Sequence, residues 1–337
     1  MRTLIVGIGA LGGVIAARLR AAGAPVCLAT RSAESAAKLR ASGLRVTGVA
    51  GALSVQVAEV ATLDAYRDRE PFELVVLATK AQDAVDVGPR VPALLAGGGT
   101  LLPIQNGGVA QLLAERLGGC VLGGLSNLGA TMTAPGIYEQ RNAGHLLVGE
   151  LAGGVSERAE RIRDALGRAV EVRLTPNIRG AVWSKLLINC SVTTIGAIAG
   201  GTMRGYMALP EGRELFDRAY DEALSAALAS GSHPEKMLVD PMPPGWAGRS
   251  VPGEAHDAWL GQIASFYGDV KPSMLQDFER GRTTEIEFIN GYVVTVGRQH
   301  GVPTPVNAAI VETVQAITRG ELSPDPALLR RVLQASR

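Results

Sequence analysis

Lys185 and Asn189 lie one helical turn apart, so both side chains fall on one face of the helix that their segment predicts. Apolar residues occupy the three positions 186–188 between them. A lysine in such a segment either extends its ammonium group to water or is partly desolvated, which lowers its pKa. In the second case it can donate a proton near neutral pH, as a general acid does. The position of Lys185 alone leaves both readings open.

A hydroxyl group and two carboxylates near the C-terminus form a second group of candidates. Ser273 opens the segment Ser-Met-Leu-Gln-Asp, and Glu285 and Glu287 lie in the first turn of a helix expected over 284–300. The helix dipole favours carboxylates in a first turn, and this effect alone would explain either glutamate. Spacing therefore does not separate a catalytic carboxylate from a structural one here.

At the N-terminus, a glycine-rich turn has the spacing G-x-G-x-x-G that dinucleotide-binding proteins use around a pyrophosphate. Gly7 would allow the tight turn, Gly9 the close approach of the pyrophosphate, and Gly12 the packing of the helix on the sheet. The free N–H groups at the helix start would face the phosphates. A plain glycine-rich strand–turn–helix is the alternative. The turn consists of Gly7, Ile8, Gly9, Ala10, Leu11 and Gly12.

The end of the second expected strand indicates which dinucleotide binds. An acidic residue about 20 positions beyond the glycine turn would accept a hydrogen bond from a ribose 2′-hydroxyl group. This chain has Thr30-Arg31-Ser32 there, and a guanidinium group can bind a 2′-phosphate through two parallel hydrogen bonds. Arg31 therefore favours NADP(H) over NAD(H), with a solvated loop residue as the alternative.

Two further polar residues follow strongly apolar strands. Lys80 comes after the strand expected over 74–78, and Asn106 after the strand expected over 100–104. Ligands of open parallel sheets bind beyond the carboxyl ends of the strands. Lys80 could contact phosphate or ribose, and Asn106 could contact both cofactor and substrate. Either residue could instead cap the helix that follows it.

The elements that would position these residues alternate in type along the first 125 residues. Near-continuous apolar strands that alternate with helices predict a parallel sheet covered on both faces. Right-handed crossovers make a doubly wound, Rossmann-type α/β fold the simplest solution. The strands are expected over 3–6, 25–29, 44–46, 74–78, 100–104 and 120–122, and the helices over 10–22, 33–41, 84–95 and 109–117.

After about residue 126 the pattern changes to antiparallel strands over 131–148 and then mostly to helix. We therefore expect an NADP-binding domain over 1–175, with a short antiparallel extension near 126–149, and a helical substrate and catalytic domain over 176–337. Five prolines between 233 and 252 predict a surface loop insertion, with a lid over a cleft as the alternative. The later helices are expected over 156–167, 178–199, 211–230, 255–267, 284–300 and 304–318.

Composition excludes several classes of partner. Thirty-three Lys and Arg against 32 Asp and Glu give a net charge of +1, which supplies no global field for nucleic acid or anionic membranes. Cys27, Cys120 and Cys190 lie far apart, and no metal-ligand spacing of histidines occurs, so we expect neither disulfides nor a metal site. The uncharged stretch 186–203 is as long as a membrane span but carries polar residues and glycines, and we interpret it as a buried helix and turn. We expect a cytoplasmic protein.

In combination, these motifs resemble the ketopantoate reductase (2-dehydropantoate 2-reductase) family over nearly the whole chain. The most specific are Lys-Leu-x-x-Asn-Cys, which starts at Lys185, Ser-Met-x-Gln-Asp, which starts at Ser273, and Thr-Glu-Ile-x-x-Ile-Asn-Gly, which ends at Gly291. The resemblance implies that a hydride of NADPH reduces the 2-keto group of ketopantoate and gives (R)-pantoate, on the route to pantothenate and coenzyme A.

The resemblance also implies a role for each matching residue. Lys185 would be the general acid, and Glu285 the carboxylate that contacts both cofactor and active site. Asn106 and Asn189 would hold the substrate by hydrogen bonds, and Ser273 would donate its hydroxyl group to it.

Lys80, by the same resemblance, would lie beside the cofactor. Where some members have two further substrate asparagines, this chain has Thr193 and Met203. These departures leave another branched 2-keto acid open as the substrate. A β-hydroxyacid-type dehydrogenase and a non-catalytic NADP(H)-binding regulator are the remaining alternatives. The partner expected is a small-molecule 2-keto acid, and a homodimer is the candidate assembly.

Overall fold

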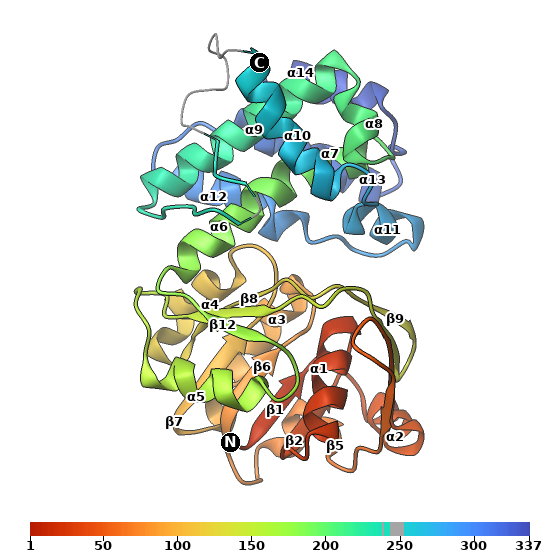
Figure 1. Ribbon diagram of the computed structural model, residues 1–337, viewed down its shortest axis with the longest axis vertical. Coiled ribbons are helices and arrows are strands. Elements are labelled where there is room, and N and C mark those ends of the chain that lie inside the picture. Colours follow the sequence, from red (N-terminus) through yellow and green to blue (C-terminus); the bar gives the residue numbers. More distant parts are fainter. Residues whose placement is uncertain (238, 243–252) are drawn as a thin grey trace. The chain divides into compact units, whose positions relative to one another are not determined.

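The computed structural model describes residues 1–237, 239–242 and 253–337 (Figure 1). The chain divides between Ile178 and Arg179 into two compact units, close to the boundary expected after residue 175. We call them unit 1 and unit 2 and describe each by itself. Leu238 and residues 243–252 of the proline-rich segment lie outside the described residues.

Unit 1 is built on a five-stranded parallel sheet with the order β5-β2-β1-β6-β7. Strand β1 and most of β6 are buried apolar runs, as a sheet covered on both faces requires. The strand order reverses where β6 returns beside β1, and in doubly wound folds this is the point where ligands bind. The strands are β1 (Thr3–Val6), β2 (Val26–Thr30), β5 (Val60–Thr62), β6 (Phe72–Leu77) and β7 (Leu95–Pro103).

Helices connect these strands mostly where the pattern predicts them. They are α1 (Ala10–Ala21), α2 (Ala33–Ser42), α3 (Ala81–Val87) and α4 (Val109–Leu117). The helix expected over 84–95 is wrong: α3 begins at Ala81 and ends at Val87. Pro89 and Pro92 cannot continue its hydrogen bonding, and two short 3₁₀ turns, Gly88–Arg90 and Pro92–Leu94, lead into β7 instead.

Two smaller sheets complete unit 1. A mixed sheet has the order β4-β3-β10-β9, and α1 packs against it as well as against β1 and β2 (Figure 1). A third sheet has the order β12-β11-β8 and is covered by α5. The elements are β3 (Leu44–Gly48), β4 (Leu53–Val55), β8 (Gly123–Ser126), β9 (Ala130–Ala134), β10 (Ile137–Gln140), β11 (Leu146–Gly149), α5 (Glu157–Leu166) and β12 (Val172–Leu174).

These sheets correct two expectations. The strand expected over 44–46 forms, but it belongs to the mixed sheet and not to the parallel sheet. Its side chains alternate, with Leu44 and Val46 buried and Arg45 exposed. Such alternation is typical of a half-buried strand rather than of a central parallel one. The strand expected over 120–122 is replaced by β8, which begins at Gly123 and pairs antiparallel with β11.

Unit 2 is helical in its described part. α9 lies at its centre and packs against α7, α8, α12, α13 and α14 (Figure 1). The chain enters through one continuous helical segment, α6 (Ile178–Ile188), a π-helical turn (Asn189–Thr193) and α7 (Thr194–Ile198). The remaining helices are α8 (Met203–Met207), α9 (Pro210–Ala229), α10 (Gly253–Tyr267), α11 (Ser273–Glu279), α12 (Asn290–Gln299), α13 (Pro305–Thr318) and α14 (Ala327–Ala335).

The segment Ile178–Ile198 is apolar and long enough to span a membrane by length and composition, but 83% of its apolar window is buried inside the protein. It is therefore the buried helix that the uncharged stretch predicts. The helix expected over 284–300 is wrong at its start. Residues Ile286–Phe288 form a separate 3₁₀ turn, and α12 begins only at Asn290.

Candidate functional site

The glycine-rich turn of unit 1 has the geometry that a dinucleotide requires. Gly7 has φ +92°, and its N–H group donates to the carbonyl group of Ala29 at 3.1 Å. A Cβ atom at Gly12 would lie 2.0 Å from the carbonyl oxygen of Gly7, so the start of α1 packs directly on the turn. At Gly9 an added Cβ atom would meet no heavy atom within 4 Å. The open space is thus at the glycine whose expected role is to let a pyrophosphate approach.

The N-terminus of α1 is also free to receive an anion. Gly9 occupies the N-cap position, no side chain caps the helix, and no acidic residue lies in its first turn. Main-chain N–H groups at such a helix start are donors to phosphate oxygens. The residues of this turn fit a dinucleotide.

Tyr138 of β10 supports this turn, and no motif in the sequence pointed to it. Its hydroxyl group donates to the carbonyl oxygen of Ile8 at 3.1 Å. Its ring packs so closely on α1 that a Cβ atom at Gly13 would lie 2.2 Å from it. Tyr138 is fully buried, and this burial raises its pKa to about 12, so it stays a hydrogen-bond donor. Tyr138 and Gly13 are more than 120 residues apart, and no local spacing connects them.

Arg31 lies in the loop after β2, and its side chain is 85% exposed. Its guanidinium group pairs with the carboxylate of Asp83 on α3 at 2.9 Å. Asp83 is a second residue that the sequence did not single out. An exposed ion pair of this kind is weak, so a phosphate can compete with Asp83 for the guanidinium group.

Lys80 and Asn106 follow β6 and β7, at the carboxyl edge of the parallel sheet. Lys80 is at the N-cap position of α3 but makes no side-chain capping bond, and Asn106 precedes Gly108, the N-cap residue of α4. Neither side chain caps its helix. Gln105 links the loop that carries Asn106 to the loop that carries Lys80. Its amide group donates to the carbonyl groups of Leu77 and Thr79 at 2.9 and 3.0 Å.

In unit 2, Lys185 and Asn189 lie on the continuous helical segment, one turn apart as expected. Lys185 is partly buried, and this burial lowers the pKa of its ammonium group to about 8, although the Glu285 carboxylate acts to raise it. The rings of Trp183 on α6 and Tyr292 on α12 pack with their centroids 5.5 Å apart. This contact ties the helix that carries Lys185 to the helix that follows Glu285.

Glu285 and Glu287 do not lie in the first turn of a long helix, so the helix-dipole explanation is wrong for both. Glu285 immediately precedes the short 3₁₀ turn, and Glu287, inside that turn, accepts a hydrogen bond from Gln315 of α13 at 2.5 Å. Ser273 is exposed and is the first residue of α11. Thr193 donates its hydroxyl group to the carbonyl oxygen of Asn189 at 2.8 Å, within its own helical segment.

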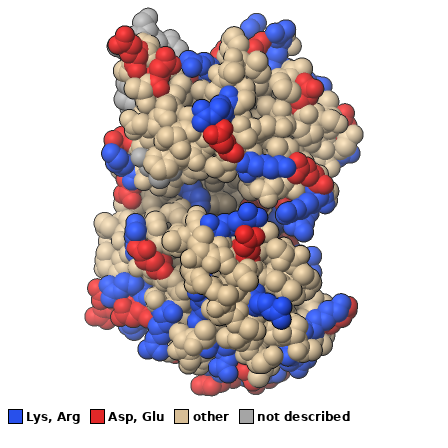
Figure 2. Space-filling model, turned by 45° about the vertical axis from the view of Figure 1, so that its right-hand side comes forward, with Lys and Arg blue, Asp and Glu red and all other residues tan. Residues whose placement is uncertain are grey.

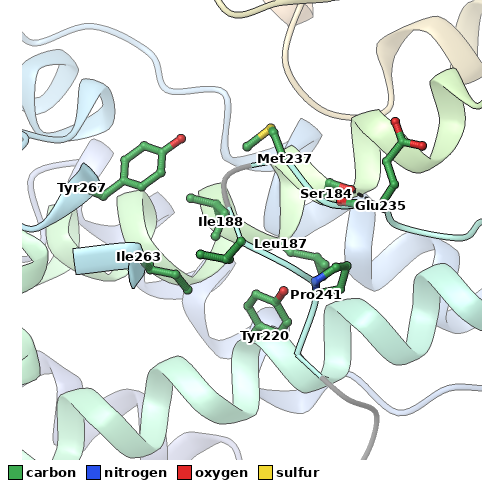
Figure 3. Close-up of a pocket in the computed structure, with 10 residues that line it drawn as sticks. Ser184, Leu187, Ile188, Tyr220, Glu235, Met237, Pro241, Ile263 and Tyr267 are labelled. Carbon is green, nitrogen blue, oxygen red and sulfur yellow. Dashed lines mark hydrogen bonds between the residues drawn. The ribbon is translucent and has the colours of Figure 1, made fainter. Parts of the chain in front are cut away.

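A small pocket of about 310 Å³, including its open mouth, is lined in part by α6 (Figure 3). Leu187 and Ile188 of α6, Tyr220 of α9 and Ile263 of α10 line it, with residues of the segment 235–241. Ser184 fastens that segment, since its hydroxyl group accepts from the N–H group of Glu235 at 2.8 Å. Lys185 and Asn189 do not line this pocket, so it is distinct from the candidate catalytic residues.

On the face in Figure 2, Lys and Arg side chains are interspersed with Asp and Glu. Within the described residues no group of three or more His, Cys, Asp or Glu could hold a metal ion. All three cysteines are free thiols, with Cys27 and Cys190 buried.

Two family models match the chain. The model described as "Ketopantoate reductase PanE/ApbA" matches residues 3–153, and "Ketopantoate reductase PanE/ApbA C terminal" matches residues 177–318. Between them they cover most of both units. The first match contains the glycine turn, Arg31, Lys80 and Asn106, and the second contains the candidate residues of unit 2.

Individual relatives agree with the family models. A 2-dehydropantoate 2-reductase from Halobacterium salinarum is 27% identical over 322 residues, which cover 95% of this chain and 99% of the relative. The solved ternary structure of a D-mandelate dehydrogenase with NADH and anilino(oxo)acetate is 20% identical with a TM-score of 0.79 and covers 95% and 99% of the two chains. The solved structure of a dimeric ketopantoate reductase from Staphylococcus aureus is 20% identical with a TM-score of 0.72. The match covers 96% of this chain and 100% of the relative. The two solved structures confirm the predicted fold class.

Proposed function

The chain belongs to the ketopantoate reductase family, and from this premise we propose that it reduces the 2-keto group of ketopantoate to (R)-pantoate with NADPH. The cofactor supplies a hydride to the carbonyl carbon when it is bound. The carbonyl oxygen must gain a proton as its double bond to carbon is lost. The chain's own residues bind and orient the reactants and supply that proton.

The residues of unit 1 bind the dinucleotide in this proposal. The N–H groups at the start of α1 hold the pyrophosphate in the open space at Gly9. Arg31 exchanges its ion pair with Asp83 for the 2′-phosphate, which selects NADP(H). Lys80 and Asn106, at the carboxyl edge of the sheet, contact the cofactor, and Asn106 also contacts the substrate.

The partial burial of Lys185, one turn from Asn189 and under the influence of the Glu285 carboxylate, is the observation that carries the chemical part of the proposal. With a pKa of about 8 the ammonium group holds its proton at neutral pH but releases it far more readily than an exposed lysine does. Lys185 donates this proton to the carbonyl oxygen as negative charge develops there, and the neutral amine then takes up a proton from water. Glu285 keeps the ammonium form populated before the reaction.

Asn189 and Ser273 hold the substrate in this proposal. Asn189 lies one turn from Lys185, so its amide group can bind the carboxylate or keto oxygen of the acid that Lys185 protonates. Ser273 is exposed at the first position of α11 and offers a hydroxyl donor.

The decisive experiment follows NADPH oxidation with a panel of 2-keto acids that includes ketopantoate. We expect the highest kcat/KM with ketopantoate. A rate at background level with every member would refute the enzymatic proposal, and tight NADPH binding without turnover would identify a regulator. Faster oxidation of 3-hydroxy acids than reduction of 2-keto acids would instead indicate a β-hydroxyacid-type dehydrogenase.

A second candidate is the reduction of another branched 2-keto acid. Two observations favour it: Thr193 and Met203 occupy positions at which some family members have asparagine, and Met203 is fully buried. The D-mandelate dehydrogenase, with NADH in its structure, extends the fold to another 2-hydroxy acid. A panel member with a kcat/KM tenfold above that of ketopantoate would establish this alternative, and parallel assays with NADH would reveal a different cofactor.

We also propose a cytoplasmic homodimer. The support is the three free thiols, which fit a reducing compartment, and the dimeric relative from Staphylococcus aureus. Light scattering of the purified protein distinguishes a dimer from a monomer, and a monomeric mass at micromolar concentration would contradict the proposal.

A further inference from the structure

The helix that carries Lys185 changes its hydrogen-bond pattern at Asn189. Residues Asn189–Thr193 form a π-helical turn, in which the N–H group of Thr194 donates to the carbonyl group of Asn189, five residues back. A π turn inside an α-helix is rare and costly, and such turns occur frequently at functional sites. Here the turn begins at the residue that we propose to hold the substrate.

Side chains donate to three consecutive carbonyl groups of this turn. The hydroxyl group of Thr193 donates to Asn189 at 2.8 Å, the amide group of Asn290 to Cys190 at 3.1 Å, and the hydroxyl group of Tyr206 to Ser191 at 3.0 Å. Main-chain carbonyl groups in a buried segment need such donors when the regular helical pattern is interrupted. These three donors therefore stabilise the π turn against a return to regular α-helix.

Asn290 is the donor with the widest connections. Its side chain is fully buried, and its amide group donates both to Cys190 and to the side-chain oxygen of Asn307 at 2.9 Å. Its side-chain oxygen accepts from the hydroxyl group of Thr194 at 2.9 Å. Every hydrogen-bonding group of this side chain thus has a partner, and two of the three bonds go to the helical segment that carries Asn189.

Asn290 also begins α12, five residues after Glu285. Of these donors, Thr193 belongs to the turn itself and Tyr206 lies on α8, whereas Asn290 connects the turn to the segment of chain that carries Glu285. The hydroxyl group of Thr194 also lies 3.0 Å from the Asn189 carbonyl oxygen, but Thr194 belongs to the same helical segment as the turn. A bond at this point links the π turn, which begins at Asn189, to the segment that follows Glu285.

We propose that Asn290 is a positioning residue, which holds the π turn and the Glu285 segment in register so that Asn189, Lys185 and Glu285 act on one substrate. This inference rests on the proposed function for its catalytic part. Asn290 touches neither substrate nor cofactor in it and acts only through the residues it holds. Catalytic groups displaced by about 1 Å can lose about 100-fold in rate, so the effect of losing Asn290 is measurable.

The chain offers a matched control, Asn307. Asn307 is also fully buried, and its amide group donates to Ala219 at 3.1 Å and to Glu222 at 2.8 Å. Asn307→Ala breaks the same hydrogen-bond network but leaves the bond from Asn290 to Cys190 and the bond that Asn290 accepts from Thr194. A purely structural role predicts the same behaviour for Asn290→Ala and Asn307→Ala, whereas a positioning role predicts different behaviour.

The experiment compares the two variants in three measurements. For Asn290→Ala we expect kcat to fall about 100-fold and the KM for the 2-keto acid to rise, with the KM for NADPH unchanged. We expect faster amide hydrogen exchange over 189–195 in Asn290→Ala alone. For Asn307→Ala we expect a similar loss of thermal stability, with kcat within about threefold of the parent. Equal losses of kcat in both variants, or unchanged exchange over 189–195, would overturn the proposal.

Thr194→Val provides a milder variant should Asn290→Ala fail to fold. It removes, with little change in shape, the hydroxyl group that lies 2.9 Å from the Asn290 side-chain oxygen and 3.0 Å from the Asn189 carbonyl oxygen, and we expect a kcat loss of about tenfold with the same unchanged KM for NADPH. A parent-like kcat in Thr194→Val would count against the proposal. If the parent reduced no 2-keto acid, the proposed function would be wrong, while the exchange comparison would still decide whether Asn290 holds the turn.

Discussion

At the scale of single residues, two opposed influences set the protonation of Lys185. Burial favours the neutral amine, and the Glu285 carboxylate favours the ammonium ion. Burial is the stronger of the two, which leaves the pKa at about 8. The sequence could not predict whether the pKa of Lys185 is raised or lowered. The direction depends on how closely unit 2 encloses a side chain that could equally have extended to water.

The first prediction concerns pH. The proton-donating form of Lys185 is present below its pKa, so kcat for reduction should be level below about pH 8 and fall tenfold per pH unit above it. Glu285→Gln removes the influence that raises this pKa, so the alkaline limb should move to lower pH. Steady-state kcat measured from pH 6 to pH 10 tests both expectations, with saturating cofactor and substrate.

Replacing Lys185 provides the companion measurement. Lys185→Ala should lower kcat by about 10²- to 10⁴-fold, as the loss of a general acid does, with NADPH binding near normal. Lys271→Ala is the control, because Lys271 is a half-exposed lysine of the same unit that pairs with Glu279. A kcat of Lys185→Ala within tenfold of the parent would show that Lys185 only binds substrate or supports the fold.

Arg31 allows a second prediction at this scale. Arg31→Ala should weaken NADPH binding by about 1.5–3 kcal/mol, or about 10- to 150-fold, through the loss of a charge-assisted contact to the 2′-phosphate. NADH binding should hardly change, since NADH lacks that phosphate. Fluorescence titration of both cofactors measures the two dissociation constants. Equal weakening for both would mean that Arg31 acts on the fold or on the pyrophosphate.

At the scale of the elements, local patterns predicted more than long-range ones did. The glycine turn, the strand–helix alternation around it and the helical segment from Ile178 follow from periodicity and spacing that lie within a few turns of chain. The helix expected over 84–95 failed because prolines interrupt it, and the start of α12 was misplaced because a 3₁₀ turn precedes it. Tyr138 was missed, and Asn290 entered only as part of a motif without a role, because each acts through a hydrogen bond across about 100 residues or more.

Tyr138 carries the prediction for this scale. Tyr138→Phe removes the donor to the Ile8 carbonyl group, so we expect a loss of about 1–3 kcal/mol in stability and weaker dinucleotide binding, because the turn is less well held. Tyr66→Phe is the matched control: Tyr66 is an equally buried tyrosine of unit 1 that donates to Leu28 at 3.0 Å, away from the turn. Urea unfolding and NADPH titration of both variants test the expectation.

Comparable loss of stability in the two variants with weaker NADPH binding in Tyr138→Phe alone would assign the tyrosine to the turn. Unchanged NADPH binding in Tyr138→Phe would contradict that assignment and leave the residue as part of the core.

At the scale of the whole molecule, the ion pairs differ mainly in exposure. Most join exposed side chains and contribute little to stability. The Glu150–Arg158 pair is an exception, with the two side chains only 18% and 24% exposed and two hydrogen bonds of 2.5–2.7 Å between them. Arg158 also donates to the carbonyl groups of Gly119 and Val121, so the pair connects α5 to the chain before β8.

This pair makes stability depend on pH in a defined direction. The hydrogen bonds from Arg158 lower the pKa of Glu150, so the pair contributes above the unfolded-state pKa of about 4.3 and its contribution is lost as the pH falls through the lower folded-state pKa. Glu150→Gln should cost about 1.5–3 kcal/mol at pH 7 and less near pH 3. Glu171→Gln, in an exposed pair with Arg173, should cost far less, because solvent screens that pair. Urea unfolding at the two pH values tests this, and a cost for Glu150→Gln that does not vary with pH would contradict it.

The order of the two units along the chain has a consequence for biosynthesis. Unit 1 is one uninterrupted stretch that ends at Ile178, and its last strand, β12, is complete at Leu174. Domains generally fold as units during synthesis, and those that emerge first generally fold first. On the function proposed above, the part of the dinucleotide site that unit 1 supplies would therefore form before unit 2 folds around Lys185 and Glu285, and a dinucleotide could stabilise the half-folded enzyme before it can catalyse anything.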